Sequence, residues 1–442
     1  MKKELSFWQI INMSFGFMGV QYAFGLQQAN MSPIYRYLGA DEANLPFLWL
    51  AGPITGLIIQ PIIGAMSDQT WHPRLGRRRP YFLVGAIFTS LALILMPHSK
   101  TVFMAAALMW LLDGAANVTM EPFRAFIADK LPEGQRTVGF AVQSFFVGFG
   151  QTLANIMPFI LPIIGVVVAG SGDNGIPDYV KYSFYVGAFA IILTVLWTIY
   201  TTDEYPPEDL EAFKQKQQGS SFGKTILKTI NEIKEAIINM PQAMRQLWWV
   251  KFFTWYGLPM MWQYLGLSIA RHCFNAPSPS SPGFDEGTKY GGMGLAIFSI
   301  ACFIISFFLP KISAVISRRM THALCLTIGF VGFLLMQFTN NLQLTLACMF
   351  LVGIAWGSIM SMPYVLLASS VPAHRMGVYM GIFNMFIVIP QFISMATVPF
   401  LYNIILGGDP RTALLFAGIC LLLAAFACFG VKEETASNAS NS

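Results

Sequence analysis

The sequence predicts an all-α membrane protein with about twelve transmembrane helices. Its 442 residues are 55% hydrophobic and only 11% charged, and the mean hydropathy is +0.57. Soluble domains usually spend about a quarter of their residues on Asp, Glu, Lys and Arg, so a soluble fold could not bury this much apolar surface. The apolar residues come in runs of about 20 without alternation, which is typical of spanning helices and not of barrel strands.

Twelve apolar runs of helical length follow one another along the chain. They lie at 7–29, 46–67, 80–97, 102–128, 138–168, 181–201, 247–270, 289–309, 321–338, 343–370, 377–400 and 411–430. The long polar stretch falls between the sixth and the seventh run. We therefore expect two pseudo-symmetric six-helix halves, 1–201 and 247–431, joined by a cytoplasmic linker, 202–246, and followed by a cytoplasmic tail, 432–442.

The loop charges predict the orientation in the membrane. Lys and Arg are concentrated in the loops on the side of the amino terminus, where Lys2, Lys3 and the run Arg77–Arg79 lie. Basic loops stay in the cytoplasm. We therefore expect both termini to be cytoplasmic, in a multi-pass protein of the cell inner membrane or plasma membrane.

The linker carries an amphipathic pattern. Apolar residues recur at steps of three and four from Phe222 to Met244, with Lys224, Lys228 and Glu232 between them. This pattern predicts a helix that lies along the cytoplasmic leaflet. It would serve as a tether between the halves or as a regulatory or partner-binding element.

An internal repeat relates the two halves. The segment Trp110–Gly139, with Glu121-Pro122 inside it and Pro, Arg and Gly at its exit, is echoed six spans later by Trp356–Gly377 with Met362-Pro363. Transporters that rock one half against the other around a midplane site have this organisation.

Charged residues inside the fourth span are the first functional candidates. A charge in the hydrocarbon costs about 2.5–3.5 kcal/mol even on the lenient insertion scale, and helical geometry places Asp113, Asn117, Glu121 and Arg124 on one face. Glu121 and Arg124 can pair at i, i+3, whereas Asp113 is about 16 Å from Arg124 along the axis. An unpaired acid in low dielectric takes up a proton more readily. These residues predict a proton-coupling site, with a structural ion network as the alternative.

A glycine- and arginine-rich turn between the second and third spans is the second motif. It runs from Gly64 through Asp68 to Pro80. Gly64 permits close helix approach, Asp68 can accept hydrogen bonds, and the arginines can bind headgroups and cytoplasmic carboxylates. With the two span exits, the predicted conformational motif comprises Gly64, Asp68, Arg74, Gly76, Arg77, Arg78, Arg79, Arg136 and Arg375.

These motifs resemble the major facilitator superfamily, in the form found in proton-coupled sucrose carriers and bacterial disaccharide symporters of the glycoside-cation type. The resemblance rests on Asp68–Pro80, on the series from Asp113 to Asp129, and on Met376–Asn384. It implies that Asp113 is the proton site and that Arg124 serves coupling or sugar binding. Glu121 departs from the plant pattern, which has a small residue there.

Amide and aromatic side chains within the spans are candidates for binding a sugar, because hydroxyls need hydrogen bonds and pyranose faces need flat surfaces. Trp255 and Trp262 are seven residues apart and so share a helix face, with Gln263 beside them. Each candidate alone also suits helix packing. The predicted substrate-binding residues are Gln21, Tyr22, Asn117, Gln143, Gln151, Trp255, Trp262, Gln263, Trp356 and Asn384.

The sequence therefore predicts a carrier that imports a disaccharide, of the maltose or sucrose type, together with a proton. Asp113, Glu121 and Arg124 would couple proton movement to sugar movement. The expected partners are the sugar, H⁺ and membrane lipid, and we expect the protein to be a monomer. We expect no enzyme, cofactor, metal site or nucleic-acid partner, and the histidines should lie at the surface. A proton-coupled exporter and a nutrient sensor without transport are the alternatives.

Overall fold

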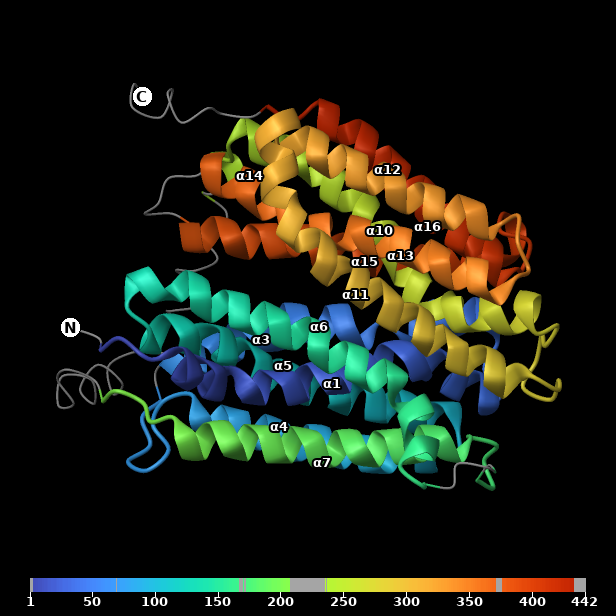
Figure 1. The fold of residues 1–442 in the computed structure, drawn as a ribbon, viewed down its shortest axis with the longest axis horizontal. Coiled ribbons are helices and arrows are strands. Elements are labelled where there is room, and N and C mark those ends of the chain that lie inside the picture. Colours follow the sequence, from blue (N-terminus) through green and yellow to red (C-terminus); the bar gives the residue numbers. More distant parts are fainter. Residues whose placement is uncertain are drawn as a thin grey trace. The chain divides into compact units, whose positions relative to one another are not determined.

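The computed structural model describes residues 3–68, 70–166, 170, 172–206, 235, 237–370 and 376–432. Every regular element named in this part of the chain is a helix, so the predicted all-α class is confirmed (Figure 1). The helices are α1 (Phe7–Tyr37), α2 (Leu45–Leu48), α3 (Ala51–Asp68), α4 (Arg79–Leu95), α5 (Val102–Lys130), α6 (Glu133–Ile163), α7 (Asp178–Thr201), α10 (Gln242–Cys273), α11 (Phe284–Ile316), α12 (Arg318–Met336), α13 (Leu342–Ile359), α14 (Met362–Ser370), α15 (Met376–Ile404) and α16 (Pro410–Phe429), with short 3-10 turns at Glu42–Asn44 and Met96–His98.

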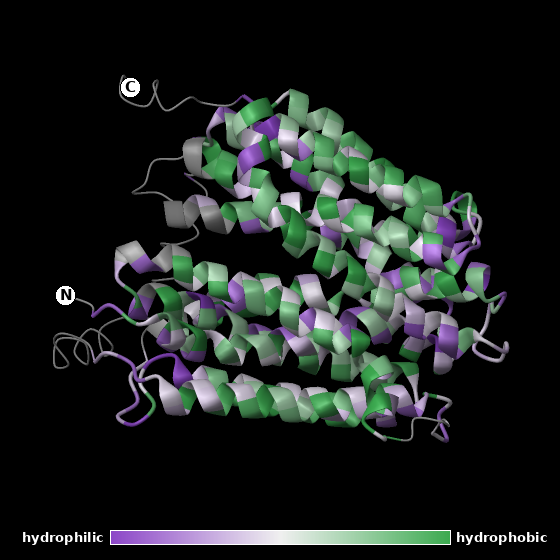
Figure 2. Ribbon diagram, in the orientation of Figure 1, coloured by the Kyte–Doolittle hydropathy of each residue, from purple (hydrophilic) through white to green (hydrophobic). Residues whose placement is uncertain are grey.

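Ten segments of the described chain are long and apolar enough to cross a membrane. Figure 2 shows their mostly hydrophobic helices, with hydrophilic residues frequent at helix ends and in loops. The long helices α1 and α10, which match the first and seventh predicted spans, are not among the ten. Both carry several polar side chains within the helix. A total of twelve spans, and the cytoplasmic position of the termini, stay predictions.

One predicted span is divided in the structure, and two predicted features lie mostly or wholly outside the described residues. The predicted span 343–370 consists of two helices, α13 and α14, because Pro363 in the first turn of α14 cannot continue the hydrogen bonding of α13. The amphipathic linker helix, Phe222–Met244, lies mostly outside the described residues, as does Arg375.

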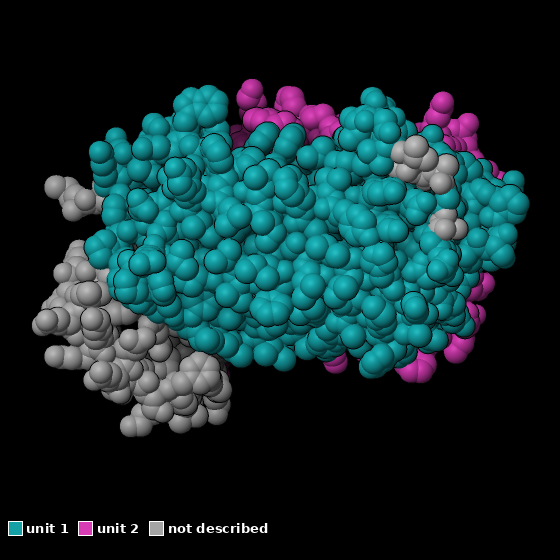
Figure 3. Space-filling model, turned by 90° about the horizontal axis from the view of Figure 1, so that it is seen from below, with its two compact units in different colours: residues 1–207, 262–299 teal, residues 208–261, 300–442 magenta. Residues whose placement is uncertain are grey.

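The chain divides into two compact units, which Figure 3 shows in different colours. Unit 1 comprises residues 1–207 and 262–299, and unit 2 comprises residues 208–261 and 300–442. Helices α10 and α11 therefore contribute to both units. In unit 1, α1 packs against α6 and α7, and α5 packs against α3 and α4. In unit 2, α12 packs against α13 and α16.

Aromatic side chains fill the core of unit 1. Phe82 of α4 stacks on Phe123 of α5 with ring centroids 3.8 Å apart, and Phe17 and Phe126 pack around them. Backbones approach closely beside these rings. A Cβ added at Gly85 would lie 1.9 Å from Thr119 Oγ1 and 2.6 Å from the backbone oxygen of Ala115.

We expect Gly85→Ala to lower stability by about 1–3 kcal/mol or more, because the backbone oxygen of Ala115 cannot move without shifting α5 against α4. Gly148→Ala on α6 is the matched control, because a Cβ there meets no atom within 4 Å, and loss of glycine flexibility should stabilise it by up to about 1 kcal/mol. Thermal unfolding of the purified variants in detergent measures both. Equal melting temperatures would contradict the tight packing at Gly85.

Buried ion pairs hold the segment 262–299 to the end of α1 within unit 1. The Glu42 side chain is only 7% exposed, and its Oε1 and Oε2 lie 3.4 Å from Arg36 Nη2 and 2.7 Å from Arg271 Nη2. Tyr264 OH donates to the backbone oxygen of Glu42 at 3.0 Å. We call these four residues the Glu42 clamp.

Candidate functional site

Helix α5 carries the acid that the sequence singled out. Thr101 caps α5, because its side chain accepts the backbone N–H of Met104 at 3.2 Å, and the helix continues through Pro122 to Lys130. Asp113 lies in its middle and is 1% exposed. Gln27 Nε2 of α1 donates to Asp113 Oδ1 at 3.0 Å. Asp113 Oδ2 has no hydrogen-bond partner among the described residues.

The surroundings of Asp113 are built from small and amide residues of α3. A Cβ at Gly52 would lie 3.7 Å from Asp113 Oδ2. One turn along α5, Asn117 Nδ2 donates to Thr55 Oγ1 at 3.1 Å, and Asn117 Oδ1 accepts from Gln60 Nε2 at 2.7 Å. Asp113 and Asn117 therefore share a buried polar surface with α1 and α3.

The second half of the predicted polar face is more open. Arg124 Nη1 lies 3.9 Å from Glu121 Oε2, and the two side chains are 49% and 33% exposed. This matches the i, i+3 pair that the sequence allows. Because both side chains are this exposed, the charges of Glu121 and Arg124 are accessible from outside the packed core. A pair of this kind contributes at most about 1 kcal/mol to stability.

Several predicted sugar-binding amides lie between α1 and α6. Gln151 Nε2 donates to Gln21 Oε1 at 3.0 Å. The buried Tyr22 hydroxyl and Asn155 Oδ1 have no hydrogen-bond partner among the described residues. Gln143, in contrast, donates to the backbone oxygen of Phe123 at 2.9 Å and so joins α6 to α5.

The remaining predicted sugar-binding residues fall in both units. In unit 2, Trp255 of α10 meets Trp356 of α13 edge to face, with ring centroids 5.7 Å apart, and Asn384 is half-buried on α15. In unit 1, Gln263 is buried and Trp262 is half-buried, and Gln263 Nε2 has no hydrogen-bond partner within the described chain.

Sequence reasoning missed three residues of this site. Gln27 binds Asp113, and Thr55 and Gln60 bind Asn117. The sequence shows each as a polar residue in an apolar run, but only the packing of α1 and α3 on α5 reveals its partner. The prediction of surface histidines is wrong for His322, which is 1% exposed, because α12 turns it toward α13, where its Nδ1 lies 2.7 Å from Ser358 Oγ.

The arginine-rich turn between α3 and α4 forms a compact polar network. Arg78 Nε donates to Asp129 Oδ2 at 2.7 Å, and its Nη1 donates to Ser67. Arg79 Nη1 donates to the backbone oxygens of Ile199 and Thr202 at 2.9 and 3.0 Å. Arg74 is exposed, and the side chains of Asp68 and Arg136 lie outside the described part. Gly64 lies beside α5, since a Cβ there would be 3.8 Å from Glu121 Cγ.

Glu204 organises this turn and was missed by sequence reasoning. Its carboxylate accepts the backbone N–H groups of Arg77, Arg78 and Arg79 at 2.8–3.1 Å. It thereby satisfies donors at the start of α4 and places a negative charge at the positive end of the helix dipole. Gly76 contributes a φ of +76°, where a side chain would also clash with Glu204.

Lys130 lies at the cytoplasmic end that the sequence predicts for α5, over the ring of Tyr205 at 3.6 Å. Burial lowers the pKa of its ammonium group, and the carboxylates of Asp203 and Glu204 oppose this effect. The turn, the end of α5 and the segment after α7 are thus electrostatically linked.

We expect Glu204→Gln to loosen the turn, because it weakens three charge-assisted hydrogen bonds of about 1.5–3 kcal/mol each. Hydrogen exchange of the amides of residues 77–79 should accelerate. Asp203→Asn is the matched control, since the Asp203 side chain is 91% exposed and its Oδ1 pairs with Arg79 Nη1 at 3.1 Å. Equal exchange rates in the two variants would contradict the capping role of Glu204.

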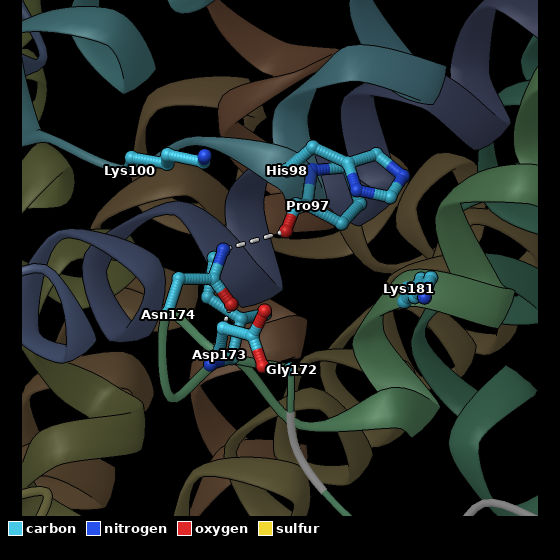
Figure 4. Close-up of a pocket in the computed structure, with 8 residues that line it drawn as sticks. Pro97, His98, Lys100, Gly172, Asp173, Asn174 and Lys181 are labelled. Carbon is cyan, nitrogen blue, oxygen red and sulfur yellow. Dashed lines mark hydrogen bonds between the residues drawn. The ribbon is translucent and has the colours of Figure 1, made fainter.

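A cavity of about 540 Å³ lies elsewhere in unit 1 (Figure 4). It is lined by Pro97, His98, Lys100, Gly172, Asp173, Asn174, Ile176 and Lys181. Asn174 Nδ2 donates to the backbone oxygens of Pro97 and Ser99 at 2.8 Å each. The predicted coupling and sugar-binding residues do not line it, so this cavity is separate from the polar surface around Asp113.

The sequence of the chain is similar to a known protein family and to individual transport proteins. The model of the Major Facilitator Superfamily matches residues 13–395 and 280–442. The chain is 26% identical to the sucrose transport protein SUT5 of Oryza sativa subsp. indica, over 88% of this chain and 82% of that protein. It is 24% identical to the general alpha-glucoside permease of Schizosaccharomyces pombe, over 68% of this chain and 55% of the permease.

Solved structures share the fold at lower identity. The nucleoside transporter NupG superposes with a TM-score of 0.66 at 13% identity, and the match covers 96% of this chain and 100% of the NupG chain. The xylose transporter XylE from E. coli superposes with a TM-score of 0.63 at 14% identity, covering 97% and 100%. The proteins named in these comparisons are transporters and a permease, and not enzymes.

Proposed function

We propose that this chain, which belongs to the Major Facilitator Superfamily, imports a disaccharide of the maltose or sucrose type by proton symport. The observation that carries the proposal is Asp113, a buried carboxylate with one oxygen bound by Gln27 and the other without a partner among the described residues. The similarity to a sucrose transport protein and to an alpha-glucoside permease supports a sugar as the substrate.

Asp113 would bind the coupled proton. An ionised carboxylate with only one hydrogen bond is costly in a low-dielectric interior, and protonation removes that cost. Gln27 can donate to Oδ1 in both states of the acid, while Oδ2 is the atom that would carry the proton. A carrier with a neutral Asp113 and a bound sugar could then reorient, whereas the ionised, empty carrier would do so less readily.

Glu121 and Arg124 would relay this charge state toward the more open end of α5. They share the helix with Asp113, and their weak 3.9 Å pair leaves both charges able to find new partners. Asn117 lies between the two ends and ties α5 to α3 through Thr55 and Gln60. A change in the protonation of Asp113 that shifts α5 would therefore also shift α3 through these hydrogen bonds.

Sugar hydroxyls would be bound by the amides and hydroxyls of α1 and α6. Gln21 and Gln151 already form one hydrogen bond and retain further donors and acceptors. Tyr22 and Asn155 each hold a buried polar atom without a partner in the described chain. Within unit 2, the edge-to-face pair Trp255 and Trp356 is a separate candidate surface for packing against a pyranose ring.

The other candidate functions make different predictions. An exporter that uses Asp113 as an antiporter would drive efflux when the outside is acid. A sensor would bind sugar without moving it. Uptake of labelled maltose, sucrose and glucose into proteoliposomes, with and without an inward proton gradient, separates the three. Symport predicts accumulation of a disaccharide that needs the gradient, and absence of sugar movement under every gradient would overturn the proposal.

A further inference from the structure

Lys251 is a buried lysine that the proposed cycle leaves unused. It lies on α10 in unit 2 and is 1% exposed. Its Nζ has no hydrogen-bond partner among the described residues, and no Asp or Glu of that part pairs with it. An ammonium group removed from water normally finds a carboxylate or several oxygen acceptors.

Three aromatic rings surround Lys251 instead. Its Nζ lies 4.5 Å from the ring centroid of Tyr364 on α14, 4.6 Å from Phe383 on α15 and 5.7 Å from Trp255 on α10. Ring faces attract a cation, and more strongly when water is excluded. We call these residues the Lys251 cage.

Among the described residues, His322 of α12 is a further titratable group near Lys251. It is buried and bound to Ser358 of α13, with 2.7 Å between His322 Nδ1 and Ser358 Oγ. Tyr364 is the titratable group from α14, and Phe383 contributes only its ring from α15.

Two opposing effects act on the Lys251 proton. Loss of water favours the neutral amine, while the three rings favour the ammonium form. Two of the rings belong to α14 and α15, so a movement of either helix away from α10 would remove part of the attraction. The balance between the two forms therefore depends on how these helices pack.

We propose that Lys251 is a second proton-binding site of the carrier, whose occupancy is set by the contact of α10 with α14 and α15. The ammonium releases its proton to water when the rings withdraw, and the amine takes one back when they close. The inference rests on the proposed function only in that the chain is a carrier with moving helices. It does not require that Asp113 binds a proton or that the substrate is a sugar.

The test is a difference titration of purified protein in detergent, without sugar. We count the protons that wild type, Lys251→Met and Lys251→Arg release between about pH 6 and about pH 9. This interval lies below the pH at which a free lysine side chain loses its proton. Wild type should release one proton more than either variant. Methionine has no proton to release, and arginine keeps its proton throughout this pH interval. Lys311→Met, which removes an exposed lysine of α11, gives the baseline for losing a lysine.

Removal of one ring tests the cage itself and does not depend on folding of the Lys251 variants. Tyr364→Leu should move the extra proton release toward acid by up to about one pH unit. Phe426→Leu, at a 62% exposed ring of α16, is the control and should leave the curve in place.

Three results would overturn the proposal. One is a wild-type curve that matches Lys251→Met throughout the range, which would mean that Lys251 does not exchange its proton there. Another is loss of the extra release in His322→Gln with Lys251 intact, which would assign it to His322. The last is a curve that Tyr364→Leu leaves unmoved. Failure of gradient-driven sugar uptake would contradict the proposed function and leave these titrations unaffected.

Discussion

Asp113→Asn should abolish gradient-driven accumulation of the sugar while leaving exchange of labelled for unlabelled sugar. Asparagine resembles the protonated acid in shape and charge, so the loaded carrier can still reorient, but it cannot take up or release a proton. For one proton per sugar, an inward gradient of about one pH unit supports about a tenfold accumulation. The variant should stay at a ratio of about one.

The control for this variant is Asp173→Asn, which removes an exposed carboxylate from a loop. It should accumulate sugar as the wild type does. Labelled-sugar uptake and counterflow in proteoliposomes give both quantities from one preparation. Accumulation by Asp113→Asn at the wild-type level would show that the proton is carried elsewhere.

Glu42→Gln should cause the largest loss of stability, by about 3–5 kcal/mol. The Glu42 carboxylate is nearly buried and lies within ion-pair distance of two arginines, Arg36 and Arg271. Without it, two largely buried guanidinium groups lose that acceptor, and the link between the end of α1 and the segment 262–299 weakens. Thermal unfolding in detergent should show a clear fall in melting temperature.

Glu286→Gln is the matched control within the same unit. Glu286 is 47% exposed and pairs with Lys289 one turn away at 3.5 Å. Exposed pairs of this spacing contribute about 0.3–0.5 kcal/mol. If Glu42→Gln melts at the same temperature as Glu286→Gln, the Glu42 clamp does not stabilise the fold.

The helical fold followed from the sequence because the membrane imposes it. Runs of apolar residues long enough to cross a bilayer must satisfy their backbone groups internally, so the positions of α4, α5, α7 and α16 could be predicted closely. The break between α13 and α14 was less visible, although Pro363 marks it. Proline also lies within α5, at Pro122, where the helix continues.

The geometry of the candidate site was predictable where one helix contains its residues. Asp113, Asn117, Glu121 and Arg124 follow from the helical period alone, as does the Glu121–Arg124 pair. The partners Gln27, Thr55, Gln60 and Glu204 could not be predicted, because each lies far along the chain from the group that it binds. Sequence spacing within one helix says nothing about which neighbouring helix packs on it.

Proton movement that accompanies sugar movement is the central claim, and a pH electrode measures it directly. Proteoliposomes are suspended in weakly buffered medium without a pH gradient, and maltose or sucrose is added outside. Symport predicts that the medium becomes more alkaline as the sugar enters, and that Asp113→Asn abolishes this change while sugar still enters down its gradient. Sugar entry without any pH change in the wild type, or with acidification of the medium, would contradict the account.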